Sequence, residues 1–565
     1  AKCTFTSDSP TFTVNFPAPG EYDIRISCGT SDSASFSSET EFINDANTVT
    51  LTDTVKSFYV RRELRELTMR DREAYLDTFM ALHLTTYHEG KEKYGKYFRP
   101  LTDFEIMHLK GAAARGFDHL HDGVGLPTQH IAMTAEFELA MQAFNPEVTI
   151  PYWDYTIDSA RVKLRGGDDK DMLMFMNSTM FSEEFFGETD SEAHTVTKGR
   201  FAYQELKRDY NFTVRSAYGF LRAPWNINPN KYVTRYHSYC GDFRRDAAGL
   251  SEMTGAEIGT WPTCESHFQL SNPTNLSTGE NGYTTYDSWA WDVGYVPHGP
   301  VHEYVGGLGG DCGSKWADMM YKGWINETQL TGMKTMAFNV LKNLWRNELI
   351  ETPKYCAEDV PVTECMWVCS ENITTNSLAS GEMGLMGFGN ATTLPDAQNT
   401  PHYDEIVRTA LCETPFWPGD HLEAASPIEA SFWPIHPTID RLLQYKDLAT
   451  PFQVKEYGMS EDIATGGITA DSTEMCSDKT TQGENNNICF GHNAYDVTFF
   501  RSTHKTKDGN WIQTHLTNWE VRQSQMVTGE YGLPYLYNHY EWDHCADVGV
   551  TFMAVSDADE LIDDE

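Results

Sequence analysis

Six histidines of this 565-residue chain stand in two spaced sets of three. Neutral imidazole is the usual protein ligand for copper, iron, nickel and zinc, and three imidazoles can hold one ion while leaving a position open. Two such ions side by side favour the chemistry of oxygen. The six residues are His108, His121 and His130, followed by His298, His302 and His436.

The sequence around these histidines predicts helices. His298 and His302 are four residues apart, which places both rings on one face of a helix. His108 and His436 lie in further helical patterns, and His130 opens another. We therefore expect four helices that direct ligands into the interior of a bundle, a recurrent way to build dinuclear sites. A ligand set made only of histidine suits copper better than the carboxylate-rich pattern of di-iron proteins.

Two carboxylates are candidates for positions behind the ligands. Asp440 lies one helical turn after His436 and could accept its ring N–H, which would fix the tautomer. Glu138 follows His130 by eight residues and has either a similar or a purely structural part. A zinc hydrolase is disfavoured, because zinc helices with this histidine spacing carry Glu directly after the first histidine, where this chain has Gly299.

The chain divides by composition into three parts, predicted as domains at residues 1–57, 58–452 and 453–565. The first is rich in Ser, Thr and Asp with short alternating runs, which predicts a small β module. The central part carries all six histidines and long insertions, and Thr68 is a candidate helix cap. Alternation at residues 495–500 and 548–555 predicts a C-terminal β domain with an acidic tail. The expected fold is thus a mainly α core, a four-helix bundle holding the metals, flanked by N-terminal and C-terminal β domains.

The bulk composition limits partners and compartment. A net charge of -39 argues against nucleic acid and anionic membranes as partners, and no apolar run is long enough to span a membrane. Twelve cysteines, several in turn-rich stretches, predict disulfides, with Cys3 and Cys28 as one pairing; Cys365 and Cys369 have zinc-like spacing, but disulfides are preferred. Six glycosylation sequons also favour a secreted glycoprotein. Their acceptors are Asn177, Asn211, Asn275, Asn326, Asn372 and Asn390.

Over roughly residues 60–450 the chain resembles the type 3 copper proteins: tyrosinase, catechol oxidase and molluscan-type haemocyanin. Three motifs carry the resemblance. The first comprises His121, His130, Glu138 and Pro151-Tyr152-Trp153-Asp154. The second comprises His298, His302 and Val305-Gly306-Gly307. The third comprises Phe432, His436, Asp440 and Arg441. The resemblance implies two copper ions per chain, held by the six histidines.

The chain also departs from the family pattern. Gly299 stands where phenol-hydroxylating members often have Asn, and Ala290 stands where a Glu is usual. The resemblance therefore implies weak or absent hydroxylation of monophenols. Gln129 replaces the usual Trp before the third ligand, and His119 stands where some members carry a thioether-linked Cys.

Three further residues are candidates for contact with substrate. By resemblance, Phe432 is the aromatic ring near the metals and the substrate ring, and Gly299 follows the first ligand of the second set. Glu303 follows His302 directly and would place negative charge near the mouth of the site. Such a charge disfavours anionic phenols and tolerates cationic amines. The alternative for Glu303 is a solvated helix residue.

The leading hypothesis is a secreted dicopper oxidoreductase that binds dioxygen and oxidises o-diphenols, small phenolic substrates, to o-quinones. The first alternative is a reversible oxygen carrier, which would use the same ligands. The second is a structural or assembly protein on a tyrosinase-like scaffold, with homo-oligomers or arrays as its product. Catechol turnover separates the first hypothesis from the two alternatives.

Overall fold

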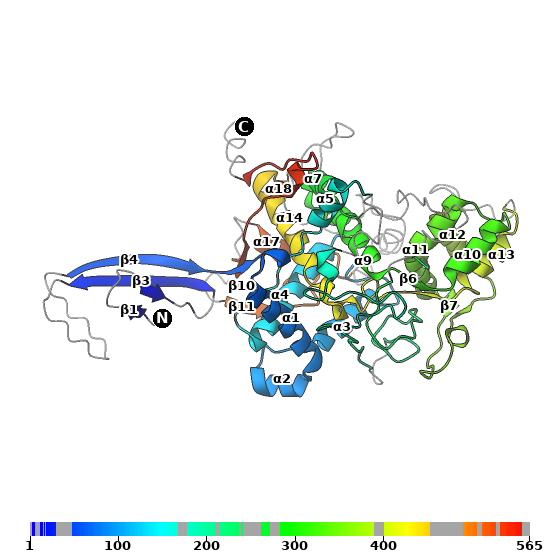
Figure 1. Cartoon of the computed structure of the whole chain (residues 1–565), viewed down its shortest axis with the longest axis horizontal. Helices are drawn as coiled ribbons and strands as arrows, with labels where there is room; N and C mark the ends of the chain where they lie inside the picture. Colours follow the sequence, from blue (N-terminus) through cyan, green and yellow to red (C-terminus); the bar gives the residue numbers. More distant parts are fainter. Residues whose placement is uncertain are drawn as a thin grey trace.

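A computed structural model of the chain describes residues 3–5, 12–14, 16, 19–29, 48–167, 178–208, 214–236, 239–240, 261–271, 283–388, 400–452, 490–505, 511–526 and 532–555. Most of its regular structure is helical, which confirms the predicted helical core (Figure 1). The helices are α1 (Met69–Leu84), α2 (Tyr87–Tyr94), α3 (Leu101–Ala112), α4 (Leu126–Phe144), α5 (Thr156–Leu164), α7 (Cys264–Ser271), α8 (Tyr286–Val293), α9 (Gly299–Gly306), α10 (Cys312–Tyr321), α11 (Glu327–Arg346), α12 (Ser377–Met383), α13 (Tyr403–Leu411), α14 (Ile435–Ala449), α17 (Asn518–Gln525) and α18 (Asp543–Ala546).

Apart from β3 and β4 the strands are short, and all of them pair only two at a time within the described residues. They are β1 (Cys3–Phe5), β2 (Phe12–Val14), β3 (Gly20–Gly29), β4 (Thr48–Ser57), β5 (Tyr59–Arg61), β6 (Leu308–Gly310), β7 (Ile350–Glu351), β8 (Val368–Cys369), β9 (Phe416–Pro418), β10 (Ser502–Lys505), β11 (Trp511–Thr514) and β12 (Tyr535–Tyr537). The antiparallel β3–β4 hairpin extends away from the helical body (Figure 1). Strand β5 pairs in parallel with β12 and so joins the start of the core to the C-terminal segment.

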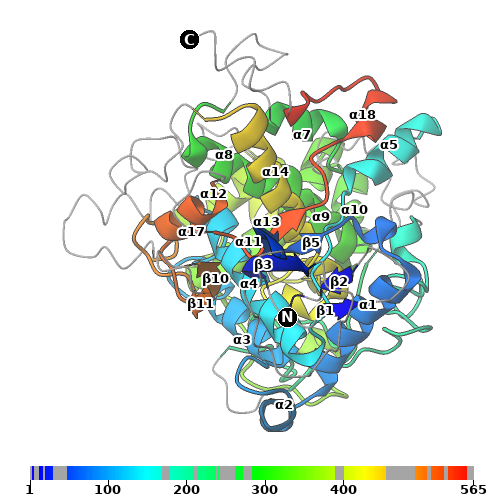
Figure 2. The same cartoon turned by 90° about the vertical axis from the view of Figure 1, so that its left-hand side faces the viewer.

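Helix α4 lies at the centre of the core. It packs against α14 and α17, and Figure 2 shows these helices grouped around it. The sequence predicted that this helix opens at His130, but it begins four residues earlier, at Leu126. Pro127 lies in its first turn, where a missing N–H costs nothing, so the Gly- and Pro-rich stretch ends in a helix start rather than continuing as loop.

The predicted cap at Thr68 is confirmed. The Thr68 side chain accepts the backbone N–H of Asp71 at 3.2 Å, and α1 begins one residue later. Arg61, seven residues before Thr68, lies in β5 and is buried. The charged side chain is buried there because acidic residues of the core pair with it.

The C-terminal alternation does not form the expected strands. Residues 495–500 and 548–555 contain no strand, and the strands of this part are β10, β11 and β12. The reason is visible at Phe499, whose backbone N–H donates to the Gln129 side chain at 3.0 Å instead of to a neighbouring strand. Phe499 and Phe500 pack on the helical core, whereas Tyr495 and Val497 are exposed. The division into three domains stays a prediction.

Four disulfides link the described part of the chain and confirm the preference for disulfides over a zinc site. The bonds join Cys240 to Cys312, Cys264 to Cys545, Cys356 to Cys365 and Cys369 to Cys412. The proposed pairing of Cys3 with Cys28 concerns side chains outside the described part, as do Cys476 and Cys489.

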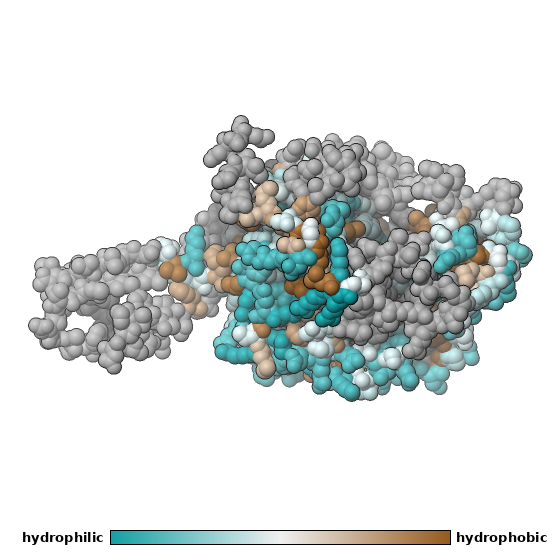
Figure 3. All heavy atoms as spheres, turned by 45° about the horizontal axis from the view of Figure 1, so that its top comes forward, coloured by the Kyte–Doolittle hydropathy of each residue, from teal (hydrophilic) through white to brown (hydrophobic). Residues whose placement is uncertain are grey.

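The described surface is mixed in character. Hydrophilic residues cover much of the face in Figure 3 and surround patches of hydrophobic ones. None of the described helices combines the length and apolar character needed to cross a lipid bilayer.

Candidate functional site

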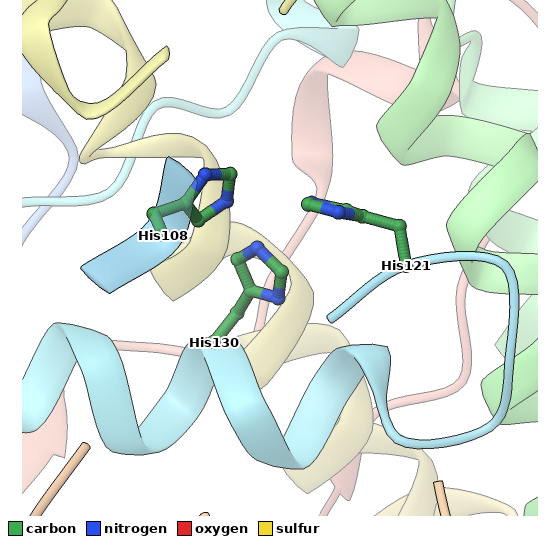
Figure 4. Close-up of side chains that lie close together, drawn as sticks. All are labelled: His108, His121 and His130. Carbon is green, nitrogen blue, oxygen red and sulfur yellow. The ribbon is translucent and has the colours of Figure 1, made fainter. Parts of the chain in front are cut away.

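The first set of histidines meets at the centre of the helical core. His108 projects from α3, His130 from α4, and His121 from the loop between these helices. Figure 4 shows the three rings turned toward one another. One nitrogen from each ring lies within 4.8 Å of the other two. The sequence prediction that these three residues form one group therefore matches their positions in the fold.

The second set meets beside the first. Nε2 of His298 lies 3.0 Å from Nε2 of His302 and 3.3 Å from Nε2 of His436. His298 ends the π-helical turn that precedes α9, His302 lies on α9, and His436 lies in the first turn of α14. His130 stacks on His436 with ring centroids 4.5 Å apart and belongs to both groups of converging nitrogens. The two sets thus form one continuous cluster.

Backbone carbonyl groups orient three of the rings. Nδ1 of His108, His130 and His302 each lies within hydrogen-bonding distance of a carbonyl oxygen, so each carries its proton there and leaves Nε2 with a lone pair. The acceptors are, in the same order, the carbonyls of Ala424 at 2.7 Å, Leu126 at 2.9 Å and His421 at 2.7 Å. These rings are therefore held in the tautomer that binds a metal through Nε2.

The inward nitrogens fit metal ions. Nε2 of His108 and Nε2 of His130 are buried and make no hydrogen bond. A buried polar atom without a partner is costly, and in native proteins it usually has a reason. Bound metal would give these nitrogens partners, and the neutral all-nitrogen donor set is one that copper accepts.

Burial keeps the cluster neutral. It lowers the pKa of His108 to about 3 and of His302 to about 4, and in His108 the neighbouring His121 lowers it further. The pKa values of His130, His298 and His436 also fall well below the ordinary value, first through burial and then through the other histidines. Lone pairs are therefore available for metal at neutral pH.

The carboxylate predicted to hold His436 has other partners. Asp440 accepts hydrogen bonds from the hydroxyl groups of Tyr535 at 2.7 Å and Tyr537 at 2.6 Å, and it pairs with Arg61 at 3.3 Å. It makes no bond to the His436 ring, so that prediction is wrong. One helical turn separates the two residues along α14, but the Asp440 carboxylate faces β5 and β12.

The role of Glu138 is structural. Its carboxylate pairs with Arg61 at 2.9 Å and accepts the backbone N–H of Ile150 at 2.9 Å. It thereby ties α4 to the segment before the Pro151-Tyr152-Trp153-Asp154 motif, and it contacts none of the histidines.

Phe432 lies against the histidines rather than in the path of a substrate. Its ring centroid is 4.5 Å from that of His436 and 5.5 Å from that of His108, and its side chain is fully buried. It is absent from the described residues that line the adjacent cavity. Phe432 therefore supports the ligand rings from inside the core.

A cavity of about 130 Å³ leads to the cluster. His121, His298 and His302 form part of its wall, and the two predicted substrate residues Gly299 and Glu303 also line it. Aromatic residues contribute further wall surface, namely Trp225, Trp291, Tyr295 and Phe338. An aromatic wall beside nitrogen ligands suits a small planar ring.

Glu303 is half-buried in this wall and is not a fully solvated residue on a helix surface. Burial raises the pKa of Glu303 to about 7, and a hydrogen bond from the Tyr239 hydroxyl at 3.3 Å opposes that rise. The group therefore changes charge near neutral pH, next to His302.

The segment at residues 420–425 was missed by sequence reasoning. The His421 carbonyl holds His302, the Ala424 carbonyl holds His108, and the His421 ring packs on His302 with centroids 4.6 Å apart. Because backbone carbonyls hold the rings, no side-chain pattern signals this role.

A buried acid next to the cluster gives a testable pH dependence. Glu105 on α3 is fully buried, neither of its oxygens has a hydrogen-bonding partner, and burial raises its pKa to about 8. Because the folded pKa exceeds the unfolded value of 4.5, its contribution to stability is fully present below about pH 4.5 and is lost as the pH rises toward 8. The loss is on the order of 1.4 kcal/mol for each unit between the two values.

We expect Glu105→Gln to remove this slope. Urea unfolding at pH 5 and pH 8 measures the free energy of unfolding of both proteins. Relative to the wild type, the variant should be more stable at pH 8 than at pH 5. Glu89→Gln on the exposed surface of α2 is the control and should follow the wild type. Equal pH dependence of wild type and Glu105→Gln would contradict the burial of an unpaired acid.

Part of this chain is similar in sequence to a known protein family. Residues 74–324 match the sequence model of the tyrosinase family described as the common central domain of tyrosinase. No curated protein matches the chain significantly. Among solved structures, a mutant form of polyphenol oxidase from Thermothelomyces thermophila is similar at 15% sequence identity, covering 85% of this chain and 89% of that chain with a TM-score of 0.30. The matched family region contains five of the six clustered histidines, and His436 lies beyond it.

Proposed function

We propose that this chain, whose residues 74–324 match the central domain of the tyrosinase family, is a dicopper oxidoreductase that uses dioxygen to oxidise o-diphenols to o-quinones. The observation that carries the proposal is the pair of converging histidine sets beside a cavity with an aromatic wall. His108, His121 and His130 would hold one ion, and His298, His302 and His436 the other. Copper bound there supplies dioxygen binding and electron exchange with a diphenol.

The residues of the chain contribute positioning and exclusion of water. Carbonyl acceptors hold His108, His130 and His302 in one tautomer, so the donor nitrogens need no reorganisation. Phe432 packs beneath the rings and keeps water from the inner side. The diphenol enters from the cavity, where His121, His298 and His302 are accessible. Its ring lies against the aromatic wall.

Diphenol oxidation is favoured over monophenol hydroxylation. Gly299 lines the cavity next to His298 and offers no side chain to hold a water as a base for a monophenol. A catechol brings two acidic hydroxyl groups and needs less help to lose a proton. Oxygen uptake should therefore be rapid with a catechol and weak or absent with the matching monophenol. Copper-loaded protein that consumes oxygen with neither would overturn the proposal, and reversible oxygen uptake without turnover would assign the site to an oxygen carrier.

The negative side chain in the cavity wall predicts a charge preference. At pH 8, above its pKa of about 7, Glu303 is ionised and should favour catechols that carry an amine cation over catechols that carry a carboxylate. Glu303→Gln should reduce the ratio of kcat/KM for these two substrates about tenfold, which corresponds to about 1.4 kcal/mol. Glu327→Gln, at the exposed start of α11, is the control. An unchanged ratio in Glu303→Gln would show that this carboxylate does not face the bound substrate.

An extracellular site of action fits the chemistry of the chain. Four disulfides in the described residues are typical of proteins from oxidising compartments. Two of the sequon asparagines, Asn326 and Asn372, lie on the described surface, whereas the other four lie outside the described residues. We therefore propose a secreted glycoprotein.

A further inference from the structure

A turn of the C-terminal segment, residues 490–493, lies against the loop that carries His121. Both ring nitrogens of His492 are used in this contact. Nε2 donates to the Asp118 carbonyl at 2.8 Å, and Nδ1 accepts the backbone N–H of Gly125 at 3.2 Å. The buried His492 ring thus bridges the two ends of the loop at residues 118–125, with His121 between them.

Close approach of backbones shows that the turn and the loop are fitted to each other. A Cβ on Gly123 would lie 2.4 Å from Nδ1 of His492, and a Cβ on Gly125 would lie 2.0 Å from the Gly491 carbonyl oxygen. Gly491 itself has φ +105°, and a Cβ there would lie 2.0 Å from the His119 carbonyl oxygen. Glycine is required on both sides of this contact.

The same turn also holds the start of α4, the helix that carries His130. The Gln129 side chain donates to the Gly491 carbonyl at 3.2 Å and accepts the Phe499 backbone N–H at 3.0 Å. On the other side, Nδ1 of His119 donates to the Phe490 carbonyl at 2.7 Å. Residues 119 and 129, two of the positions where the first motif departs from the family pattern, are therefore both contact points for the C-terminal segment.

The contact reaches His121 through a single residue. The Asp118 carbonyl receives the His492 ring, and the Asp118 carboxylate accepts Nδ1 of His121 at 3.1 Å and the His121 backbone N–H at 2.9 Å. His121 has no regular element of its own to hold it, in contrast to the other ligands. Its ring direction therefore depends on Asp118 and on the loop ends that His492 joins.

We infer that His492 is a positioning residue for the first metal site, and that the turn at residues 490–493 is a built-in part of that site. The inference concerns metal binding and goes beyond the proposed oxidation of diphenols, because it holds for any substrate. It predicts that the C-terminal segment supports the metal site, so that loosening the segment weakens metal binding instead of releasing an inhibited enzyme.

The effect of replacement follows from the position of His492 behind a ligand. Loss of a residue that orients a metal ligand typically lowers metal affinity by about 10- to 100-fold. We expect His492→Ala to lower the affinity for one of the two copper ions by about tenfold. The affinity for the other ion should stay near its wild-type value. His492→Asn keeps an acceptor for the Gly125 N–H and His492→Gln keeps a donor for the Asp118 carbonyl, so each should restore part of the loss.

The test uses the full-length chain loaded with copper and titrated with a competing chelator. His515→Ala is the control, because His515 belongs to the same C-terminal segment and bonds the Thr498 carbonyl at 2.9 Å without contacting the loop. Selective weakening in His492→Ala, partial rescue in His492→Asn or His492→Gln, and wild-type behaviour in His515→Ala would support the inference. Equal weakening in both alanine variants, or none in either, would overturn it.

Amide hydrogen exchange of the metal-free protein gives a second readout that does not depend on copper. Exchange at residues 118–125 should rise in His492→Ala, less in His492→Asn and His492→Gln, and not in His515→Ala. Unchanged exchange in the loop of a folded His492→Ala protein would also overturn the inference. If the wild type binds no copper, the proposed function fails, and this exchange experiment still decides whether His492 positions the loop.

Discussion

Replacement of His130 by alanine is expected to abolish oxidase activity, with a fall in turnover of more than about a thousandfold, as is usual when a residue on which a whole site depends is removed. His130 is the ring shared by the two groups of converging nitrogens, and it stacks on His436. Its loss therefore removes a ligand of one ion and a packing partner of the other. Copper content measured on the purified variant should fall below that of any single variant in the second set.

His267→Gln is the matched control for this experiment. His267 is also fully buried, but it contacts Tyr155 and lies outside the cluster. Neither of its ring nitrogens has a hydrogen-bonding partner. It should retain copper and activity. If His130→Ala kept oxygen-dependent turnover, or if His267→Gln lost as much, the assignment of the cluster as the metal site would be wrong.

Replacement of Arg61 by methionine is expected to lower the free energy of unfolding by about 3 to 5 kcal/mol, the usual cost of leaving buried carboxylates without their cation. Arg61 pairs with Glu138 on α4 at 2.9 Å and with Asp440 on α14 at 3.3 Å, and its guanidinium stacks on Tyr535. It thereby joins the two helices that carry His130 and His436. Urea unfolding measures the loss directly.

The control for Arg61 is an exposed ion pair. Arg70 and Glu147 lie 2.6 Å apart, but their side chains are 78% and 73% exposed, so Arg70→Met should cost less than about 1 kcal/mol. A change in Arg61→Met no larger than that in Arg70→Met would contradict the role of Arg61 as the clamp between α4 and α14. Metal affinity should fall with stability in Arg61→Met, because both ligand-bearing helices lose a shared contact.

Sequence reasoning reached the histidine cluster because imidazoles at helical spacing are visible in the chain itself. His298 and His302 share a helix face by arithmetic alone, and the motif around His121 and His130 placed the first set. The helical core followed from the same patterns. The role of these residues depends on the chemistry and spacing of their own side chains, which the sequence shows directly.

The parts that could not be predicted depend on backbone groups and on distant pairing. The carbonyl acceptors of His302 and His108 belong to a segment more than 100 residues away from either ring, and no residue type marks a carbonyl. Asp440 was assigned to His436 by proximity in sequence, but Arg61 and two tyrosines of the C-terminal segment compete for it. The alternation at residues 495–500 indicated strands because it cannot distinguish a sheet partner from a helix side chain such as Gln129.

The most direct test of the central claim is the absorption spectrum of the copper-loaded, reduced protein before and after exposure to air. Two copper ions per chain, together with a strong near-ultraviolet band that appears with oxygen and disappears under argon, are the predicted result. Copper bound at two ions per chain without such a band would show that the two histidine sets do not act together on dioxygen. A protein that binds no copper would contradict the assignment of the six histidines as a metal site.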